Sequence, residues 1–268
     1  MVYEEKAGER MNMLVVLAII LLILMYQVGG KNGIRSFISL FLNFIVVLVV
    51  VFFMLDTNTN ILILTLVAVV LISSINLFYI NGMNQKTLTA FAATLLTISI
   101  LLTLIYVVSQ QMAIHGFSEE ETEELVPYSL YIGVDFLQVS AAVIVLTTIG
   151  AIVDVAISIT SSMHEFFEQN HKMTKQQLYQ SGVAIGRDIL GTDTNTLFFA
   201  FFGGYLGLLI WFKDLSYSFG EIVNAKVFGA EMVTIFCSGI GIALIIPIAA
   251  ALSSVTLQVK HKKSKPSL

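Results

Sequence analysis

The chain has 268 residues, of which 57% are hydrophobic and only 12% are charged. Soluble domains carry about 25% charged residues, so this composition excludes an ordinary soluble protein and predicts an integral membrane protein. The formal net charge is −4, the sequence holds no long basic tract that would indicate a nucleic-acid partner, and its single cysteine excludes a disulfide framework within one chain.

Apolar segments long enough to cross a lipid bilayer recur along the whole chain. A transmembrane helix needs about 20 predominantly apolar residues. The sequence therefore predicts an all-α, polytopic membrane helix bundle with seven spans, at residues 11–27, 34–55, 61–80, 88–109, 130–160, 189–212 and 230–257. Together they form one transmembrane domain, between a short N-terminus at 1–10 and a basic tail at 258–268.

The distribution of Lys and Arg predicts the orientation. With the C-terminus inside, ten of the 14 basic residues lie in inside segments and four lie outside. Basic residues accumulate on the cytoplasmic side, so the N-terminus is expected outside and the C-terminus inside. The outside segment at about 110–129 then carries five Glu and no Lys or Arg. Ser118 begins a helix-start pattern there, which favours a short solvated helix on the outer face.

Two asparagines interrupt the apolar spans. Asn43 and Asn76 lie within the second and third spans, where each must find a hydrogen-bond partner inside the membrane. Adhesion between helices is the expected role of each, and contact with a solute is the alternative. Asn81-Gly82, after the third span, predicts a tight turn because both residue types tolerate positive φ.

The fifth span carries polar residues at helical spacing. Asp154, Ser158, Ser161 and Glu165 fall at i, i+4, i+7 and i+11, which places them on one face of a helix. A charged group at membrane depth costs several kcal/mol by most estimates, about 2.5–3.5 on insertion scales, and usually serves a function. This stripe therefore marks the first place to look for a site.

The sixth span repeats the pattern. Arg187 begins it, and Asp188, Thr192 and Asn195 share a face at i, i+4 and i+7. Asp193 and Thr196 form a neighbouring face. Gly191 lies within the span, where a half-broken helix would expose backbone groups to an ion or a headgroup. Close packing of two helices is the alternative explanation for this glycine.

Two interpretations of the stripes compete. In the first, they face each other and line a path whose carboxylates bind a cation or relay a proton. In the second, Arg187 pairs with the acids in a structural network that fastens the two helices. The candidate pathway residues are Asp154, Ser158, Arg187, Asp188, Thr192 and Asn195, with Glu165, Ser161, Asn76 and Asn43 as secondary candidates.

A polar cytoplasmic loop at 163–186 joins the two spans, and its pattern favours an amphipathic helix over a metal site. His164, Glu168 and His171 lie there at i, i+4 and i+7, which makes them weak candidates for metal ligands. The spacing departs from the HExxH zinc pattern, and no cysteine is near. We therefore expect no metal and no other cofactor. No nucleophile–base arrangement accompanies the acids, so an enzyme is not expected.

Three stretches of this sequence resemble a known family. They are the run from Gly150 to Ser158, the turn from Asn81 to Thr87, and the string Gly186-Arg-Asp-Ile-Leu-Gly-Thr-x-Thr-Asn-Thr-Leu197. The chain resembles the YibE/F family of bacterial membrane proteins over about 34–257, as a shorter, YibF-like member. The resemblance implies a multi-pass protein of the bacterial cytoplasmic membrane with a related YibE/F-type partner. Asp193 stands where an apolar residue is expected, which argues against a family-wide role for it.

These observations predict a transport protein or a permease subunit for an ion or small polar solute. It would contact lipid on its outside, and it would work as a hetero-oligomer with the related partner or as a homo-oligomer. The alternative is a non-transporting scaffold or regulatory subunit that docks a partner through residues 163–186.

Overall fold

The computed structural model describes residues 2–56, 58–112 and 135–264, and every regular element in these residues is helical. The elements are α1 (Val2–Met54), α2 (Ile61–Ser74), the π-helix η1 (Ile75–Tyr79), α3 (Gln85–Met112), α5 (Phe136–Gln169), α6 (Lys175–Gly204), α7 (Leu206–Asp214), α8 (Phe219–Asn224) and α9 (Lys226–Ser264). Five of these helices are long and apolar enough to cross a membrane, or six when the bent pair α6–α7 counts as one span. The predicted all-α membrane bundle is confirmed.

Some predictions concern residues that lie outside the described ranges. The helix expected to begin at Ser118 and the first residues of the predicted fifth span both fall in 113–134. The orientation of the chain across the membrane stays a prediction.

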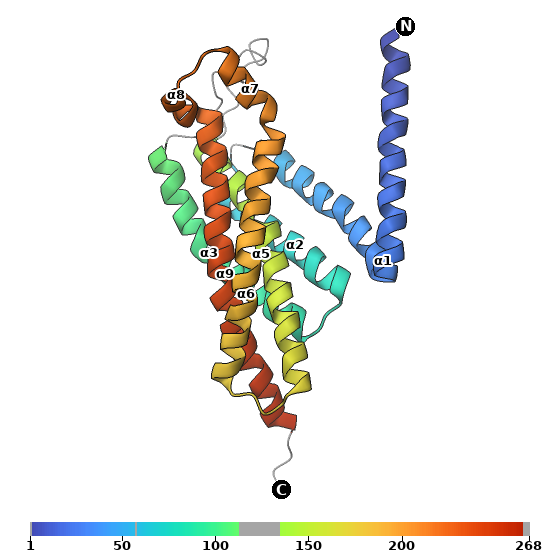
Figure 1. The fold of residues 1–268 in the computed structure, drawn as a ribbon, viewed down its shortest axis with the longest axis vertical. Helices are drawn as coiled ribbons and strands as arrows, with labels where there is room; N and C mark the ends of the chain where they lie inside the picture. The colour runs from blue at the N-terminus through green and yellow to red at the C-terminus, as the bar shows by residue number, and fades with distance from the viewer. Residues whose placement is uncertain (1, 57, 113–134, 265–268) are drawn as a thin grey trace.

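The first two predicted spans lie in a single element, α1, which is broken at Gly30. This residue has φ 55° and ψ −130°, a conformation outside the helical region that only glycine adopts readily. Gly33 follows one turn later, and a Cβ on it would overlap the carbonyl of Met25 on the opposite arm. Figure 1 shows the two arms meeting at a sharp bend, with the first arm standing apart from the bundle. From Met13 to Gly29 most side chains of that arm are exposed, as suits contact with lipid.

The stretch of α1 from Met13 to Met54 has 42 residues. A straight helix of that length would measure about 63 Å, roughly twice the thickness of the hydrocarbon core. The bend at Gly30 makes the length compatible with a bilayer. That each arm of α1 crosses the bilayer separately remains a prediction.

The two asparagines bind each other. Nδ2 of Asn43 in α1 donates to Oδ1 of Asn76 in η1 at 2.8 Å. Nδ2 of Asn81 in turn donates to the backbone carbonyl of Asn76 at 3.2 Å, where the π-helical turn leaves a carbonyl available. The predicted adhesion between helices is confirmed, whereas a role of either asparagine in a pathway stays a prediction.

Replacing Asn43 by leucine should destabilise the protein by about 0.6–2 kcal/mol, because Asn76 then loses its donor in an apolar environment. Thermal unfolding in detergent of the two single leucine variants and of the double variant measures this. We expect the double variant to lose less stability than the sum of the single variants. Strictly additive losses would show that the two side chains do not interact.

The turn before α3 has the predicted tight geometry. Gly82 has φ 75°. The hydroxyl of Thr87 donates to the carbonyl of Gly82 at 2.9 Å and accepts from the backbone N–H of Asn84 at 3.0 Å. The Thr87 backbone N–H donates to Oδ1 of Asn84 at 3.0 Å. These bonds fix the start of α3, and with it Gln85, which recurs below.

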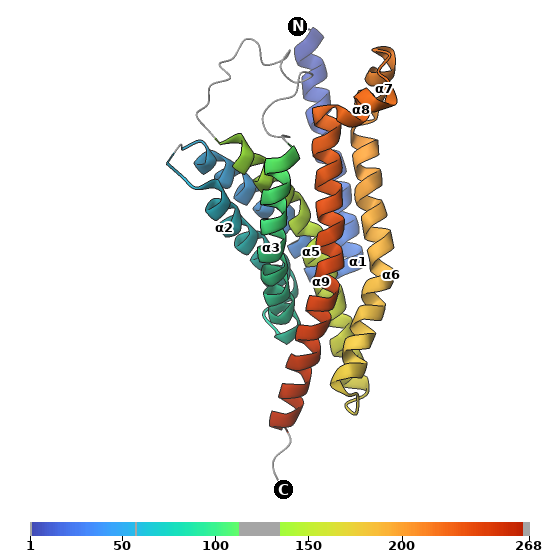
Figure 2. The ribbon, with the colours of Figure 1, turned by 90° about the vertical axis from the view of Figure 1, so that its left-hand side faces the viewer.

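The centre of the bundle is α5, which packs against α2, α3, α6 and α9. Its buried face consists largely of Ala, Val and Ile. Thr148 and Ser238 join α5 to α9 through a buried hydroxyl–hydroxyl hydrogen bond of 2.8 Å. Helix α6 covers α9 on one side, and Figures 1 and 2 both show the two running side by side. Gly182 and Gly186 permit this approach, since a Cβ on either would overlap side chains of neighbouring helices.

The segment at 163–186 is helical apart from residues 170–174, which confirms its interpretation as an amphipathic helix and leaves a much shorter loop. Helix α5 continues to Gln169 and α6 begins at Lys175, which leaves only residues 170–174 as a turn. The reason is local: Thr174 and Gln177 form a capping box that starts α6. Polar side chains on both helices face outward, so they look like loop residues in a hydropathy pattern.

Gly191 does not break the sixth span. Helix α6 passes through it without interruption and ends at Gly204, where a bend of 53° leads into α7. Tyr205 lies at this bend, and its hydroxyl donates to Oε1 of Glu231 in α9 at 2.9 Å. The irregularity therefore occurs more than three turns after the predicted position.

A polar groove between α5 and α6

A groove between α5 and α6 brings polar side chains together near the middle of both helices. It has a volume of about 580 Å³. The residues that line it, from α5 and then from α6, are Gly150, Ala151, Asp154, Ser158, Ile189, Thr192, Asp193, Thr196 and Leu197. We call this feature the α5–α6 groove.

Three of the six predicted pathway residues line the α5–α6 groove: Asp154, Ser158 and Thr192. The predicted facing of the two stripes is therefore correct at its centre. Ser161 is partly buried and Glu165 is exposed further along α5, and neither is among the lining residues.

The other three predicted pathway residues do not line the groove. Arg187, Asp188 and Asn195 are exposed on α6. Among the described residues Arg187 does not pair with Asp154, Asp188 or Glu165. The predicted network of structural ion pairs is absent from these residues.

Asp193 lines the groove, although the sequence argued against it. The α6 face that meets α5 carries Ile189, Asp193 and Leu197 at i, i+4 and i+8. The two apolar residues are the signal that sequence analysis missed, because they mark which face of α6 turns toward its neighbour. Asp188 and Asn195 lie close to each other on another side of α6, roughly 140–160° around the helix from Asp193, and point elsewhere.

The three hydroxyl groups in the groove all donate to backbone carbonyls of their own helix. Ser158 donates to Asp154 at 2.7 Å, Thr192 to Ile189 at 2.8 Å, and Thr196 to Thr192 at 2.9 Å. Each hydroxyl has one hydrogen, so only its oxygen lone pairs remain for a ligand. With two carboxylates added and no Lys or Arg among the lining residues, the groove offers acceptors to whatever enters it.

The groove opens on the flank of the bundle. Asp154, Ser158, Thr192 and Thr196 are exposed, and Asp193 is partly buried. Carboxylates at membrane depth are costly against lipid and normally face protein or a water-filled cavity. The groove therefore needs water or a second polypeptide over it.

A comparison with known families shows which one the sequence matches. The model of YibE/F-like proteins matches residues 17–259, which include the whole groove, the second arm of α1 and less than half of the first. The chain belongs to the YibE/F family. Among curated proteins and solved structures, none matches the chain.

The motif from Gly186 to Leu197 carries the family resemblance. In this YibE/F chain some of its residues pack against a neighbouring helix and others line the groove. Gly186 packs on Ile246, and Thr192 and Thr196 line the groove. Gly191 has open space where a Cβ would lie. The motif thus combines a close helix contact with a polar surface on one helix.

Two of the three weak metal candidates of the YibE/F chain, His164 and Glu168, come together. Nε2 of His164 lies 3.0 Å from Oε1 of Glu168, one helical turn away. The ring of His171 packs edge-on against Phe167. Among the described residues no group of three His, Cys, Asp or Glu side chains could hold a metal ion.

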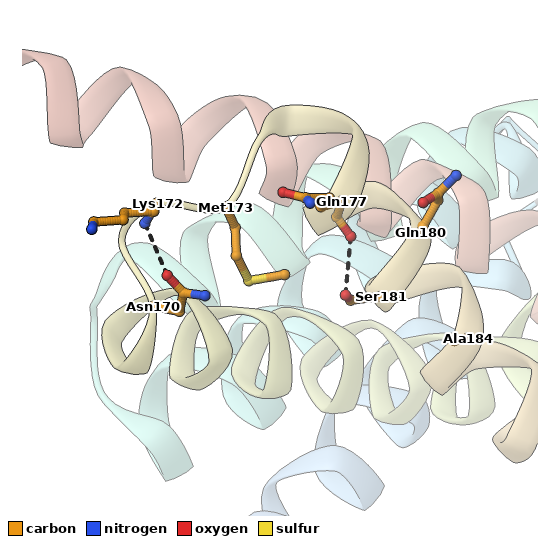
Figure 3. Close-up of a pocket in the computed structure, with 7 residues that line it drawn as sticks. All are labelled: Asn170, Lys172, Met173, Gln177, Gln180, Ser181 and Ala184. Carbon is orange, nitrogen blue, oxygen red and sulfur yellow. Dashed lines mark hydrogen bonds between the residues drawn. The ribbon is translucent and has the colours of Figure 1, made fainter.

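A second, more open pocket lies at the turn between α5 and α6 and has a volume of about 630 Å³. Its lining is polar apart from one methionine and one alanine, and consists of Asn170, Lys172, Met173, Gln177, Gln180, Ser181 and Ala184 (Figure 3). Oδ1 of Asn170 accepts from the backbone N–H of Lys172 at 3.1 Å, and the Ser181 hydroxyl donates to the Gln177 carbonyl at 3.0 Å. The side-chain oxygen of Gln177 accepts from the backbone N–H of Thr174 at 2.8 Å, so Gln180 is the lining amide whose oxygen and nitrogen are both left for a partner or solvent.

Proposed function

We propose that this YibE/F chain is a membrane transport protein, or a permease subunit, for an ion or a small polar solute, and that the α5–α6 groove binds the transported species. The observation that carries the proposal is the acceptor-only lining of the groove. Carboxylate and hydroxyl oxygens are ligands for hard cations, and they also accept from the N–H groups of small solutes. The preferred species is therefore a cation, with a proton relayed between carboxylates included.

In this proposal Asp154 and Asp193 bind the cation together. They approach the groove from opposite helices, and both lie near the middle of the spans. A cation between them would offset the cost of placing two carboxylates at membrane depth. Release of the cation would restore that cost. The free energy of cation binding therefore depends on the electrostatic cost of leaving the two carboxylates without a counter-charge.

The open flank of the groove supports a role as one subunit of a complex. A related YibE/F-type protein or a second copy of the chain would cover the exposed carboxylate of Asp154 and complete the path. We place the complex in the bacterial cytoplasmic membrane and assign the chain no catalytic step.

Replacing Asp154 by asparagine should lower cation flux at least about tenfold, because the groove loses a charge while the shape of the side chain is kept. Flux of H⁺, Na⁺ and K⁺ into proteoliposomes measures this, for the chain alone and together with a related YibE/F protein. Asp188→Asn is the matched control, since this exposed aspartate on α6 does not line the groove. Equal losses in both variants, or no flux under any gradient, would contradict the proposal.

A scaffold or regulatory subunit is the second candidate, favoured by the turn pocket. Its amides and Lys172 form a polar surface beyond the apolar part of both helices, as docking of a partner requires. The two functions differ in the residues on which they depend. Partner binding that is lost in Gln180→Ala but kept in Asp154→Asn, without any flux, would favour the scaffold.

A further inference from the structure

A small cavity lies where α3, α5 and α9 meet, close to the turns at one end of the bundle. It has a volume of about 10 Å³, and its lining includes Gln85, Lys86, His164, Ser253 and Thr256. A polar cavity of about 10–15 Å³ is the smallest that holds one water molecule. We call it the three-helix cavity.

Three buried polar atoms of its lining have no hydrogen-bond partner within the described protein: Oε1 of Gln85, Nδ1 of His164 and Oγ of Ser253. They come from α3, α5 and α9 in turn. An orphaned polar atom in a protein interior costs about 1–3 kcal/mol, so three around one cavity require an explanation.

The orientation of two of these groups is fixed by a hydrogen-bond partner at the other end of the side chain. Nε2 of Gln85 donates to the Thr256 carbonyl at 3.0 Å, which leaves Oε1 as the free end of the amide. Nε2 of His164 faces the exposed carboxylate of Glu168 at 3.0 Å. A carboxylate accepts, so in the neutral imidazole Nε2 carries the hydrogen and Nδ1 is an acceptor.

We propose that one water molecule occupies the three-helix cavity and bridges all three helices. It donates to Oε1 of Gln85 and to Nδ1 of His164, and it accepts from the hydroxyl of Ser253. These three bonds match the usual number for a buried water and satisfy all three orphaned atoms. The Lys86 side chain and the lack of a carboxylate in the lining exclude a cation as the occupant.

The water extends the His164–Glu168 pair into the bundle. The imidazole of His164 then contacts the exposed carboxylate of Glu168 through Nε2, and it contacts α3 and α9 through the water at Nδ1. Both contacts favour the tautomer with hydrogen on Nε2. This site is separate from the α5–α6 groove and does not depend on the proposed transport function.

Thermal unfolding of the full chain in detergent tests the proposal, because the sign of the change in Tm caused by one substitution depends on whether the bridge is present. With the bridge present, Ser253→Ala removes the donor to the water and lowers Tm by about 2–4 °C. Without it, the same change removes an orphaned hydroxyl and leaves Tm unchanged or raised. Ser73→Ala is the matched control, since Ser73 on α2 is also fully buried, also lacks a partner, and does not line the cavity. An equal fall in both variants, or none in Ser253→Ala, overturns the proposal.

A spectroscopic readout covers the case in which the variant unfolds. In ¹⁵N-histidine-labelled protein, we expect His164 to show the tautomer with hydrogen on Nε2 and a hydrogen-bonded, accepting Nδ1; loss of the signal in His164→Gln assigns it. We further expect Ser253→Ala to shift the Nδ1 resonance, although no direct hydrogen bond joins the two side chains. A hydrogen on Nδ1, or an unchanged resonance in Ser253→Ala, contradicts the bridge.

Discussion

Replacing Gly186 by alanine should lower the free energy of unfolding by about 1–3 kcal/mol, the usual cost of overpacking a well-filled interface. A Cβ at this position would lie 2.8 Å from Cγ1 and 3.0 Å from Cβ of Ile246 on α9. The second of these atoms is fixed to the backbone and cannot turn away. Helices α6 and α9 would have to separate along their contact, and thermal or denaturant unfolding in detergent measures the loss.

Gly191 provides the matched control on the same helix. A Cβ there meets nothing within 4 Å, so Gly191→Ala should be neutral or stabilise the protein by up to about 1 kcal/mol through helix propensity. Ile246→Ala removes both γ carbons of the opposing side chain, so Gly186→Ala/Ile246→Ala should lose less stability than the sum of the two single variants. Equal effects of Gly186→Ala and Gly191→Ala would mean that α6 and α9 are not in close contact at Gly186.

Gly30→Ala should destabilise the bend of α1 by about 1–3 kcal/mol, because an L-residue is strained at φ 55° and ψ −130°. No neighbouring atom lies within 4 Å of a Cβ at Gly30, so the effect comes from the backbone conformation alone. The change should also favour a straighter α1. Distances between spin labels on the two arms, measured before and after the substitution, report that opening directly.

Gly29→Ala isolates the backbone effect. Its Cβ also meets nothing within 4 Å, and its φ is not positive, so we expect a change within about 0.5 kcal/mol and unchanged distances between the arms. If both substitutions leave the spin-label distances unchanged, Gly30 does not hold the bend.

Hydropathy is sufficient to predict the class of this fold but not the course of its polar segments. Apolar runs of about 20 residues predict helices because no other open structure satisfies the backbone in lipid. The polar segment around the turn at 170–174 is helical for a different reason, a capping box and exposed polar faces, and only its amphipathic pattern indicates this. At the bend after Gly204, Tyr205 hydrogen-bonds to Glu231 on a distant helix, a contact that a local pattern cannot contain.

The candidate site was predictable in part. Helical spacing places Asp154 and Ser158 on one face, and the structure has both in the groove. Spacing alone does not say which face of α6 meets α5, so Asp188 was preferred to Asp193. The three-helix cavity joins Gln85 to Ser253 across most of the chain, and no sequence interval indicates that neighbourhood.

The composition of α6 has a consequence for biogenesis. This helix is long and apolar enough to enter a bilayer only together with α7, from which the bend at Tyr205 separates it. During synthesis, a translocon that partitions segments by their apolar character would retain α6 poorly by itself. The turn at 170–174 ties it to the strongly apolar α5, so the two can insert as a helical hairpin. Correct membrane integration of α6 thus depends on residues that precede and follow it.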